Sequence, residues 1–284
     1  QIVAGCLRPG DTFARTGGDE FGILMPKTDH QTASQVLIRI QEALAQFDQD
    51  QKNARYVHSI SLGLASRTSM EEEIGDVSKI AEDYMYQRKL LDHNSSHSAI
   101  IASIKATMNE TSHETGEHTE RMVALSEKIA DRLRLSQIER DRLVLLATLH
   151  DIGKISISPR ILSKPGELSP HEWVEMKRHP EIGYRIANST PDLIPIAECI
   201  LSHHERWDGE GYPRGIQGKN IPLLARILAV VDAYDAMTEN RPYRKAKTHD
   251  EAIAEIKRCA GTQFDPHIVR TLVSVLTEED AQPS

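Results

Sequence analysis

The chain has 284 residues, room for about two domains, and its hydrophobic fraction of 39% and charged fraction of 27% are typical of a soluble globular protein. Its net charge of −8 at pH 7 argues against binding polymeric nucleic acid through a basic surface. No apolar run is long enough to span a bilayer, and no signal-peptide pattern follows Gln1. The three cysteines are far apart, which indicates reduced thiols. We therefore expect a cytoplasmic location, although a longer parent protein could be tethered to a membrane through upstream sequence.

Residues 1–92 are expected to form a mixed α/β domain. Its segments alternate between the two-residue period of strands and the spacing of helices, with strands over 11–15 and 21–25, a helix over 31–47, a strand over 57–65 and a helix over 77–91. The polar stretch HNSSH at 93–97 interrupts this pattern. We place the domain boundary at residue 92 and a linker or helix over 93–114.

The second half of the chain, from about residue 98, has no segment with the alternation of a strand. Helix-start signals are frequent there: capping boxes at Ser136 with Glu139, Ser169 with Glu172 and Thr248 with Glu251, and a cap followed by proline at Asp265-Pro266. We therefore predict an all-α domain over 115–284, with helices beginning at about residue 98.

Side chains that bind metals recur across this helical half. They are Glu114, His118, His150, Asp151, His179, His203, His204 and Asp232. Glu114 and His118 stand four residues apart in a helical segment, so they share one face. Imidazoles mixed with carboxylates suit a cluster of divalent first-row metals such as iron or manganese. Such a cluster would generate an activated hydroxide, which predicts a metal-dependent phosphohydrolase.

Each of these positions also has an ordinary explanation. His118 and His179 would be unremarkable on a solvated surface, and His150 would suit a helix C-terminus. The adjacent His203 and His204 are harder to explain in this way, because two buried imidazoles would each need a partner. Asp232 lies in an apolar helix, where an unpaired buried carboxylate would cost several kcal/mol unless a metal bound it. A purely structural helical bundle does not explain these residues together.

Three longer motifs then resemble a known family. HDIGK (150–154), HHERWDGEGYP (203–213) and IPLLARILAVVDAYDAMTENRPYR (221–244) are similar to the HD-GYP branch of the HD phosphohydrolase superfamily, over about residues 98–276. The resemblance implies an HD-type helical bundle, so the overall class is α+β. It also implies hydrolysis of the bacterial second messenger cyclic di-GMP to pGpG and, in some members, to GMP.

The resemblance assigns roles residue by residue. The eight residues with metal-binding side chains would hold two ions, or three with Glu114, and Asp151 would bridge them and orient the hydroxide. Lys154 would reach a substrate phosphate or protonate the leaving oxygen, and Tyr212 would stack on guanine. Arg241 and Arg244 would bind phosphate or guanine edges, because a guanidinium matches both. A surface ion pair remains the alternative for Arg244, and a solvated lysine for Lys154.

The N-terminal part resembles a second family. RTGGDEF (15–21) and SLGLA (61–65) are similar to GGDEF diguanylate cyclases, with the signature residues Gly17, Gly18, Asp19, Glu20 and Phe21. Arg8 and Asp11 match the family's inhibitory product-binding site. The family's first strands and helix, with their metal-binding Asp, are missing before Gln1. We therefore expect an incomplete α/β GGDEF domain that does not synthesise cyclic di-GMP in this chain.

Other functions and partners remain open on the sequence. An HD hydrolase of another cyclic dinucleotide, such as 3′,3′-cGAMP, would have the same metal ligands. A catalytically silent module would bind cyclic di-GMP or contact GGDEF domains and other signalling partners, although the complete ligand set argues against it. The helix expected at about 98–108 is a candidate element for a homodimer.

Overall fold

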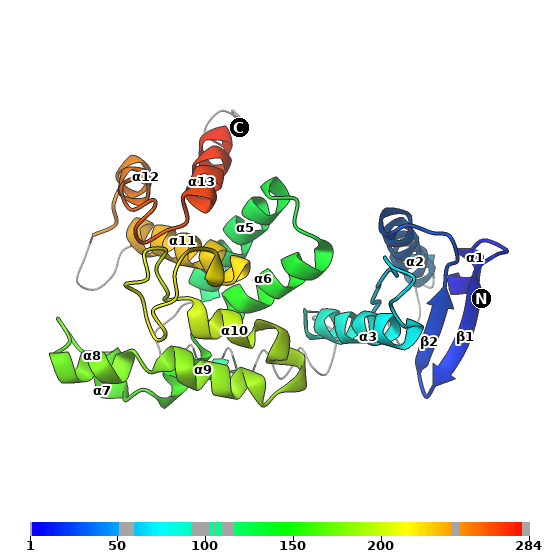
Figure 1. Cartoon of the computed structure of the whole chain (residues 1–284), viewed down its shortest axis with the longest axis horizontal. Helices are drawn as coiled ribbons and strands as arrows, with labels where there is room; N and C mark the ends of the chain where they lie inside the picture. Colours follow the sequence, from blue (N-terminus) through cyan, green and yellow to red (C-terminus); the bar gives the residue numbers. More distant parts are fainter. Residues whose placement is uncertain are drawn as a thin grey trace. The chain divides into compact units, whose positions relative to one another are not determined.

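The computed structural model describes residues 2–50, 60–91, 103–104, 106–108, 116–239 and 245–279. The chain divides into two compact units, Gln1–Ser98 and Ala99–Ser284, and the two are described separately below (Figure 1). The boundary predicted at residue 92 and most of the linker predicted over 93–114 lie outside the described residues. The domain limits therefore stay a prediction.

The N-terminal unit contains a β-hairpin and two long helices. β1 (Thr12–Gly17) pairs antiparallel with β2 (Glu20–Leu24), and the pairing is irregular between Arg15 and Gly17. The strands predicted over 11–15 and 21–25 are thus confirmed with small shifts at their ends. The helices are α1 (Ile2–Gly5), α2 (His30–Asp50) and α3 (Ile74–Leu91). The last two confirm the helices predicted over 31–47 and 77–91.

One face of α2 supplies the core of this unit. Ala33, Val36, Leu37 and Ile40 are buried and follow the three- and four-residue spacing of a helix. Leu64 packs with Ala33 and Leu37 in the same core. The apolar face read from the sequence is therefore the face that is buried.

The strand predicted over 57–65 is wrong for the part that the structure describes. Residues 60–68 have no strand hydrogen bonding, and the sheet formed by the described residues consists of β1 and β2. A strand needs a neighbouring strand to complete its backbone hydrogen bonds, and neither strand of the hairpin pairs with this segment. The alternation marks burial instead, because Leu62 and Leu64 pack against the core around α2.

The C-terminal unit is helical. Its elements are α5 (Gly116–Arg132), α6 (Gln137–Leu149), η1 (Ile152–Ser156), α7 (Pro159–Leu162), α8 (Pro170–Met176), α9 (His179–Asn188), η2 (Pro191–Leu193), α10 (Ile194–Ser202), η3 (Gly218–Asn220), α11 (Leu223–Thr238), α12 (His249–Arg258) and α13 (Pro266–Glu279). Within residues 116–239 and 245–279, strand-like pairing is confined to an isolated bridge that joins Ala260 and Phe264. The all-α prediction is confirmed for these ranges.

Helix α11 occupies the middle of this unit, where it contacts α5, α6, α10, α12 and α13 (Figure 1). Its apolar residues are buried nearly all round: Leu224, Ala225, Ile227, Leu228, Val230 and Val231. A helix that is apolar on every side is expected to be surrounded by other helices.

None of the helices in the described ranges is long and apolar enough to cross a membrane.

The predicted helix starts are also confirmed. Ser136, Ser169 and Thr248 each accept a hydrogen bond from the backbone of the glutamate three residues later, and each glutamate accepts one in return. Asp265 accepts a hydrogen bond of 2.8 Å from the His267 amide at the start of α13. Each such cap stabilises a helix by about 1 kcal/mol and fixes where it begins. The functional residues at the helix ends are positioned by these local signals.

Candidate metal centre

The step from α6 to η1 carries His150 and Asp151 into the interior. Leu146 and Leu149 are fully buried on α6, and the His150 amide continues the helix by donating to Leu146 O at 2.8 Å. Asp151 then caps the start of η1. Both side chains are buried, with 3% and 6% of the residue exposed. A buried carboxylate at the negative end of a helix requires a positive partner.

Gly153 allows η1 to approach α9. A β-carbon at this position would lie 1.9 Å from His179 O and 2.7 Å from the Gly183 amide nitrogen. A side chain is therefore excluded by backbone contact alone. This close packing brings His179, the first residue of α9, to Asp151, with Nε2 and Oδ1 3.1 Å apart. The glycine of HDIGK thus has a direct role in assembling the site.

Three of the histidines are oriented in the same way. The Nδ1 atom of each lies near the backbone carbonyl three residues earlier: His150 at 3.2 Å from Ala147 O, His179 at 2.8 Å from Met176 O and His203 at 2.6 Å from Ile200 O. A proton on Nδ1 would be donated to that carbonyl, which leaves the Nε2 lone pair for another partner. This arrangement is typical of histidines that bind metals through Nε2.

The Nε2 atoms converge on Asp151. Those of His150, His179 and His203 lie 3.2, 3.1 and 3.8 Å from its carboxylate oxygens. The Nε2 atoms of His179 and His203 are 3.2 Å from each other. Lone pairs and a carboxylate at these distances repel one another unless a cation lies among them. The donor set of this structure therefore fits a divalent metal ion.

The ligand atoms fall into two groups, in each of which they lie within 4.8 Å of one another. Asp151, His179, His203 and His204 form the first group, and His118, His150 and Asp232 form the second. The adjacent residues His150 and Asp151 belong to different groups, so the α6–η1 step joins them. The structure thus brings together seven of the eight side chains singled out in the sequence. Glu114, the eighth, lies outside the described residues.

The environment of Asp151 favours its ionised form. Burial opposes ionisation, but the Lys154 ammonium at 2.5 Å and the neighbouring His150 outweigh it and hold the pKa of Asp151 well below its usual range. Burial lowers the pKa of His203 and lowers that of His204 well below the ordinary value. A charged carboxylate with neutral imidazoles is the protonation state that binds metal.

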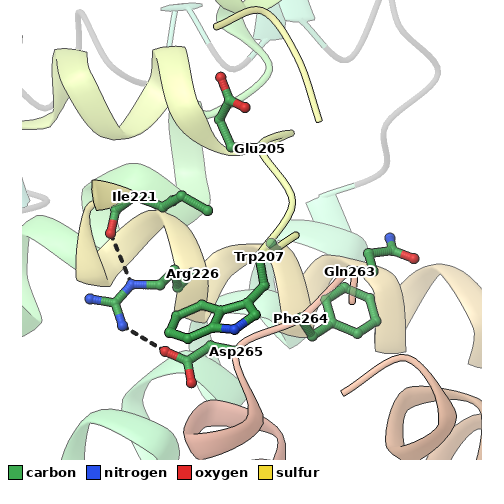
Figure 2. Close-up of a pocket in the computed structure, with 8 residues that line it drawn as sticks. Glu205, Trp207, Ile221, Arg226, Gln263, Phe264 and Asp265 are labelled. Atoms are coloured by element: carbon green, nitrogen blue, oxygen red, sulfur yellow. Dashed lines mark hydrogen bonds and ion pairs between the residues drawn. The ribbon is translucent and has the colours of Figure 1, made fainter. Parts of the chain in front are cut away.

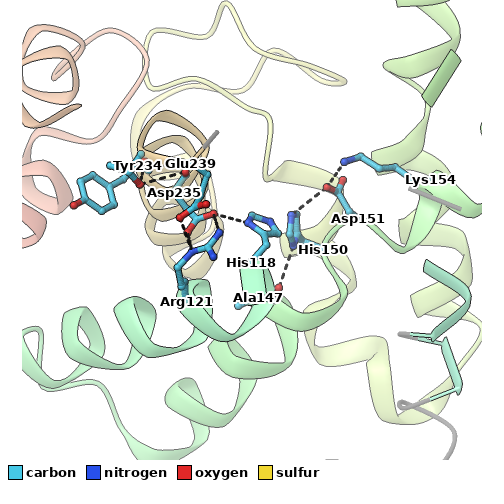
Figure 3. Close-up of polar contacts among 10 residues, drawn as sticks. His118, Arg121, Ala147, His150, Asp151, Lys154, Tyr234, Asp235 and Glu239 are labelled. Carbon is cyan, nitrogen blue, oxygen red and sulfur yellow. Dashed lines mark hydrogen bonds and ion pairs between the residues drawn. The ribbon is translucent and has the colours of Figure 1, made fainter. Parts of the chain in front are cut away.

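Asp232 lies in the second ligand group as the sequence suggests, but it is not the most buried carboxylate of α11. Asp232 is partly exposed, whereas Asp235, one turn later, is 5% exposed. Asp235 Oδ2 lies 2.6 Å from His118 Nδ1, and Arg121 donates to both oxygens of Asp235 at 2.7 and 3.1 Å (Figure 3). Burial raises the pKa of Asp235, but His118 and Arg121 together hold it below the ordinary value. The sequence reasoning missed both Asp235 and Arg121.

A signal for these two residues was present in the sequence. Arg121 lies three residues after His118, and Asp235 lies three residues after Asp232, so each shares a helix face with a predicted ligand. Asp235 orients His118 in the way that backbone carbonyls orient His150, His179 and His203. The second ligand group is therefore supported by a partly buried ion pair between α5 and α11.

The segment after His204 is fastened to α11 and to the approach to α13 (Figure 2). Arg226 of α11 forms an ion pair with Asp265 at 2.6 Å and lies 5.9 Å from the centre of the Trp207 ring. The Trp207 amide donates to Gln263 O at 3.1 Å, and Glu205 Oε1 accepts from the Arg214 amide at 2.7 Å. The segment that contains Gly211-Tyr212-Pro213 is therefore held at both ends.

Gly211 and Tyr212 bring this segment to the metal ligands. A β-carbon on Gly211 would lie 2.3 Å from the Arg206 amide nitrogen, so a side chain is excluded there. The Tyr212 amide donates to His204 O at 3.2 Å, and its ring stacks on the His204 ring at 4.9 Å. Burial raises the pKa of Tyr212, which is therefore a neutral phenol at physiological pH. Tyr212 and Lys154 are thus placed beside the first ligand group.

The remaining predicted residues lie elsewhere. Arg241 and Arg244 fall outside the described residues. In the N-terminal unit, Arg8 forms an ion pair with Asp11 at 2.9 Å. Both residues line a cavity of about 240 Å³. In the hairpin turn formed by Gly17, Gly18, Asp19, Glu20 and Phe21, all five residues are exposed.

Comparison with known proteins follows the same division of the chain. The HD domain model matches residues 83–268, more than half of the chain, and the model for diguanylate cyclase GGDEF domains matches residues 1–95. A cyclic di-GMP phosphodiesterase of Thermotoga maritima is 44% identical over 167 residues, which are 58% of this chain and 45% of that protein. The 3′3′-cGAMP-specific phosphodiesterase 2 of Vibrio cholerae is 33% identical over 214 residues, which are 72% of this chain and 41% of that protein.

A solved structure of a cyclic GMP-AMP specific phosphodiesterase of V. cholerae aligns with a TM-score of 0.47 at 22% identity, over 63% of this chain and 48% of that chain. The chain spans less than half the length of these relatives. The match to the HD model includes the ligand pair His150-Asp151 and each described member of both ligand groups. The chain belongs to the HD domain family, in its HD-GYP type, and carries a GGDEF segment before the HD domain.

Proposed function

We propose that this chain is a metal-dependent phosphodiesterase that hydrolyses cyclic di-GMP to pGpG, with GMP as a further product. The proposal is carried by the convergence of the His179 and His203 Nε2 atoms on the Asp151 carboxylate, beside the second group around His118. The T. maritima relative, 44% identical, is named a cyclic di-GMP phosphodiesterase and supports this substrate.

The proposed cofactors are two divalent ions, iron or manganese, one for each ligand group. Asp151 and His150 join the groups, and Glu114 is the proposed additional ligand of a third ion. When bound, such ions lower the pKa of a water molecule toward neutrality and supply a hydroxide for attack on phosphorus. Both metals are consistent with mixed imidazole and carboxylate ligands.

The chain's own residues have distinct proposed roles. Asp151 is fixed in its ionised form and would accept a hydrogen bond from the attacking oxygen. Lys154, with its ammonium 2.5 Å from Asp151, would shift to a non-bridging phosphate oxygen or donate a proton to the leaving 3′-oxygen. Tyr212 would contact a base, and Arg241 and Arg244 would bind phosphate or guanine edges.

The test is hydrolysis of cyclic di-GMP by anaerobically purified protein, with iron and manganese measured on the same sample. Turnover with two to three ions per chain is the expected result, and the product distinguishes pGpG from GMP. A filled site without turnover would overturn the proposal. A sample purified empty is reloaded with each metal in turn before the rate is judged.

Another cyclic dinucleotide is the second candidate substrate. The V. cholerae relative that matches 72% of this chain is named as specific for 3′3′-cGAMP. Rates on cyclic di-GMP and 3′3′-cGAMP, measured side by side, decide between them. A filled site that binds either nucleotide without cleaving it would indicate a silent signalling module instead.

The N-terminal unit contains a second candidate binding site. We propose that this unit does not synthesise cyclic di-GMP. Arg8, Asp11 and Arg39 line the cavity of about 240 Å³, and Arg8 is held by Asp11 and by Thr28 Oγ1 at 2.5 Å. Paired arginines beside a cavity suit a phosphate-containing ligand. Calorimetry with cyclic di-GMP should reveal a binding event that Arg8→Ala removes, and GTP should give no cyclic product.

Assembly and location are further proposals. We propose domain limits of 1–92 and 115–284, a cytoplasmic location and a homodimer formed through the helix predicted at about 98–108. Light scattering coupled to size-exclusion chromatography measures the oligomeric state. A monomer at micromolar concentration would contradict the dimer without affecting the proposed chemistry.

A further inference from the structure

A lysine lies near both Tyr212 and an exposed tryptophan. Trp173 is on α8 and is 45% exposed, which is unusual for a side chain of its size. The Lys177 ammonium lies 5.7 Å from the centre of the Trp173 ring and 5.4 Å from the centre of the Tyr212 ring. Tyr212 in turn stacks on His204 of the first ligand group. The series Trp173, Lys177, Tyr212 and His204 thus leads from the surface to the proposed metals.

The backbone fixes Trp173 and Lys177 relative to the metal ligands. A capping box starts α8 at Ser169, and the Lys177 amide donates to Trp173 O at 3.0 Å at the end of the helix. Two residues later, His179 reaches back with Nδ1 to Met176 O at 2.8 Å. The same short segment therefore positions a metal ligand and the Trp173–Lys177 pair.

The two aromatic rings differ in what they offer a ligand. Tyr212 already contacts His204 and Lys177 and is partly buried. Trp173 retains an exposed indole face, and base stacking on such a face contributes about 1–3 kcal/mol per base. Lys177 has three donors and no acceptor. An aromatic face with an adjacent ammonium is a suitable site for a purine that presents acceptors.

We propose that Trp173 and Lys177 form a base subsite, in which the Trp173 indole stacks on a purine and Lys177 donates to acceptors on the base edge. This inference rests on the proposed function, because it names how that site recognises its substrate. Guanine presents the acceptors O6 and N7, whereas adenine presents N7 and an amino donor. Lys177 therefore selects guanine over adenine at this position.

The test compares kinetics on three phosphodiesters: cyclic di-GMP, cyclic di-AMP and bis(p-nitrophenyl) phosphate, which has no base. Trp173→Ala should raise KM for cyclic di-GMP about tenfold with little change in kcat, and Trp173→Phe should restore most of the loss. Lys177→Met should lower the preference for cyclic di-GMP over cyclic di-AMP about tenfold. Val174→Ala, which alters a 66% exposed neighbour on the same helix, is the matched control and should change neither value.

Hydrolysis of bis(p-nitrophenyl) phosphate separates base recognition from damage to the metal centre. An unchanged rate on this substrate, with the KM effects above, supports the subsite. Equal losses on all three substrates would overturn it, because the variants would then act through the ligands. Unchanged KM for cyclic di-GMP in Trp173→Ala would overturn it as well.

A binding measurement keeps this inference separate from the proposed activity. The chain has two tryptophans, so Trp207→Phe leaves Trp173 as the only indole fluorophore. A non-hydrolysable phosphorothioate analogue of cyclic di-GMP should quench its fluorescence, whether or not the wild-type protein cleaves the natural nucleotide. With Arg8→Ala added, which removes the proposed N-terminal site, calorimetric binding of the analogue without quenching overturns the base subsite alone. Quenching without turnover on cyclic di-GMP overturns the proposed hydrolysis and supports the subsite.

Discussion

His118 on α5 and Asp235 on α11 are joined by a contact of 2.6 Å between Nδ1 and Oδ2 (Figure 3). The carboxylate is 5% exposed, and Arg121 donates to both of its oxygens. Asp235 therefore fixes the orientation of the His118 ring. The ion pair also joins two helices that frame the second ligand group, so the geometry of that group depends on a residue that is outside it.

Asp235→Asn should weaken metal binding at the second group. The amide keeps the shape of the side chain but removes the charge that orients His118, and loss of such a partner typically lowers metal affinity about 10–100-fold. Calorimetric titration of the chelated protein with Mn²⁺ measures the change directly. Asp250→Asn, at an exposed position on α12, is the control and should bind metal as the wild type does. Equal affinities in the two variants would contradict this role of Asp235.

Asp151→Ala should abolish turnover while leaving the helical circular dichroism largely intact. The change removes the carboxylate on which His150, His179 and His203 converge, and it also removes the partner of Lys154. The helices themselves are held by the apolar cores of α6 and α11, which the variant does not alter. Near-normal activity of a metal-replete Asp151→Ala sample would disprove the assignment.

Local features of this chain could be predicted from sequence because their causes are local. The capping boxes at Ser136, Ser169 and Thr248 involve residues three apart, and all three are present. The candidate metal-binding residues could be found because histidine and aspartate in an apolar setting need partners. Their chemical type, together with the motifs around them, was sufficient to name side chains that the structure brings together in two groups.

Features that depend on tertiary packing could not be predicted in this way. Arg121 and Asp235 are 114 residues apart, and their pairing follows from the contact between α5 and α11. Asp235 is buried while Asp232 is only partly buried, because the packing around α11 decides which carboxylate is covered. In the segment predicted as a strand over 57–65, apolar residues alternate as in a half-buried strand. Its described part, however, pairs with no neighbouring strand. Trp173 gave no signal until the structure placed Lys177 near both its ring and that of Tyr212.

The capping box of α8 should show a distinct pH dependence. Lys164 at 2.5 Å and Ser169 lower the pKa of Glu172 from 4.5 to about 2. A lowered folded-state pKa contributes stability above the unfolded pKa, and the contribution is lost as pH falls from about 4.5 toward 2. The difference in thermal stability between the wild type and Glu172→Gln should therefore be largest near neutral pH and shrink below pH 4.5. A carbon NMR titration of Glu172 with a midpoint near 4.5 would contradict the assigned contacts.

Gly153→Ala should move His179 away from Asp151 within the first ligand group, by altering backbone packing alone. The new β-carbon would lie 1.9 Å from His179 O, and backbone on both sides leaves no flexible side chain to move away. Either α9 moves outward, which carries His179 away from Asp151, or η1 is distorted, and such overpacking costs about 1–3 kcal/mol. We expect a lower melting temperature and a lower metal content measured by mass spectrometry. Gly75→Ala is the control, because a β-carbon there meets no atom within 4 Å. A Gly153→Ala protein with wild-type metal content and stability would show that the contact between η1 and α9 does not set the position of His179.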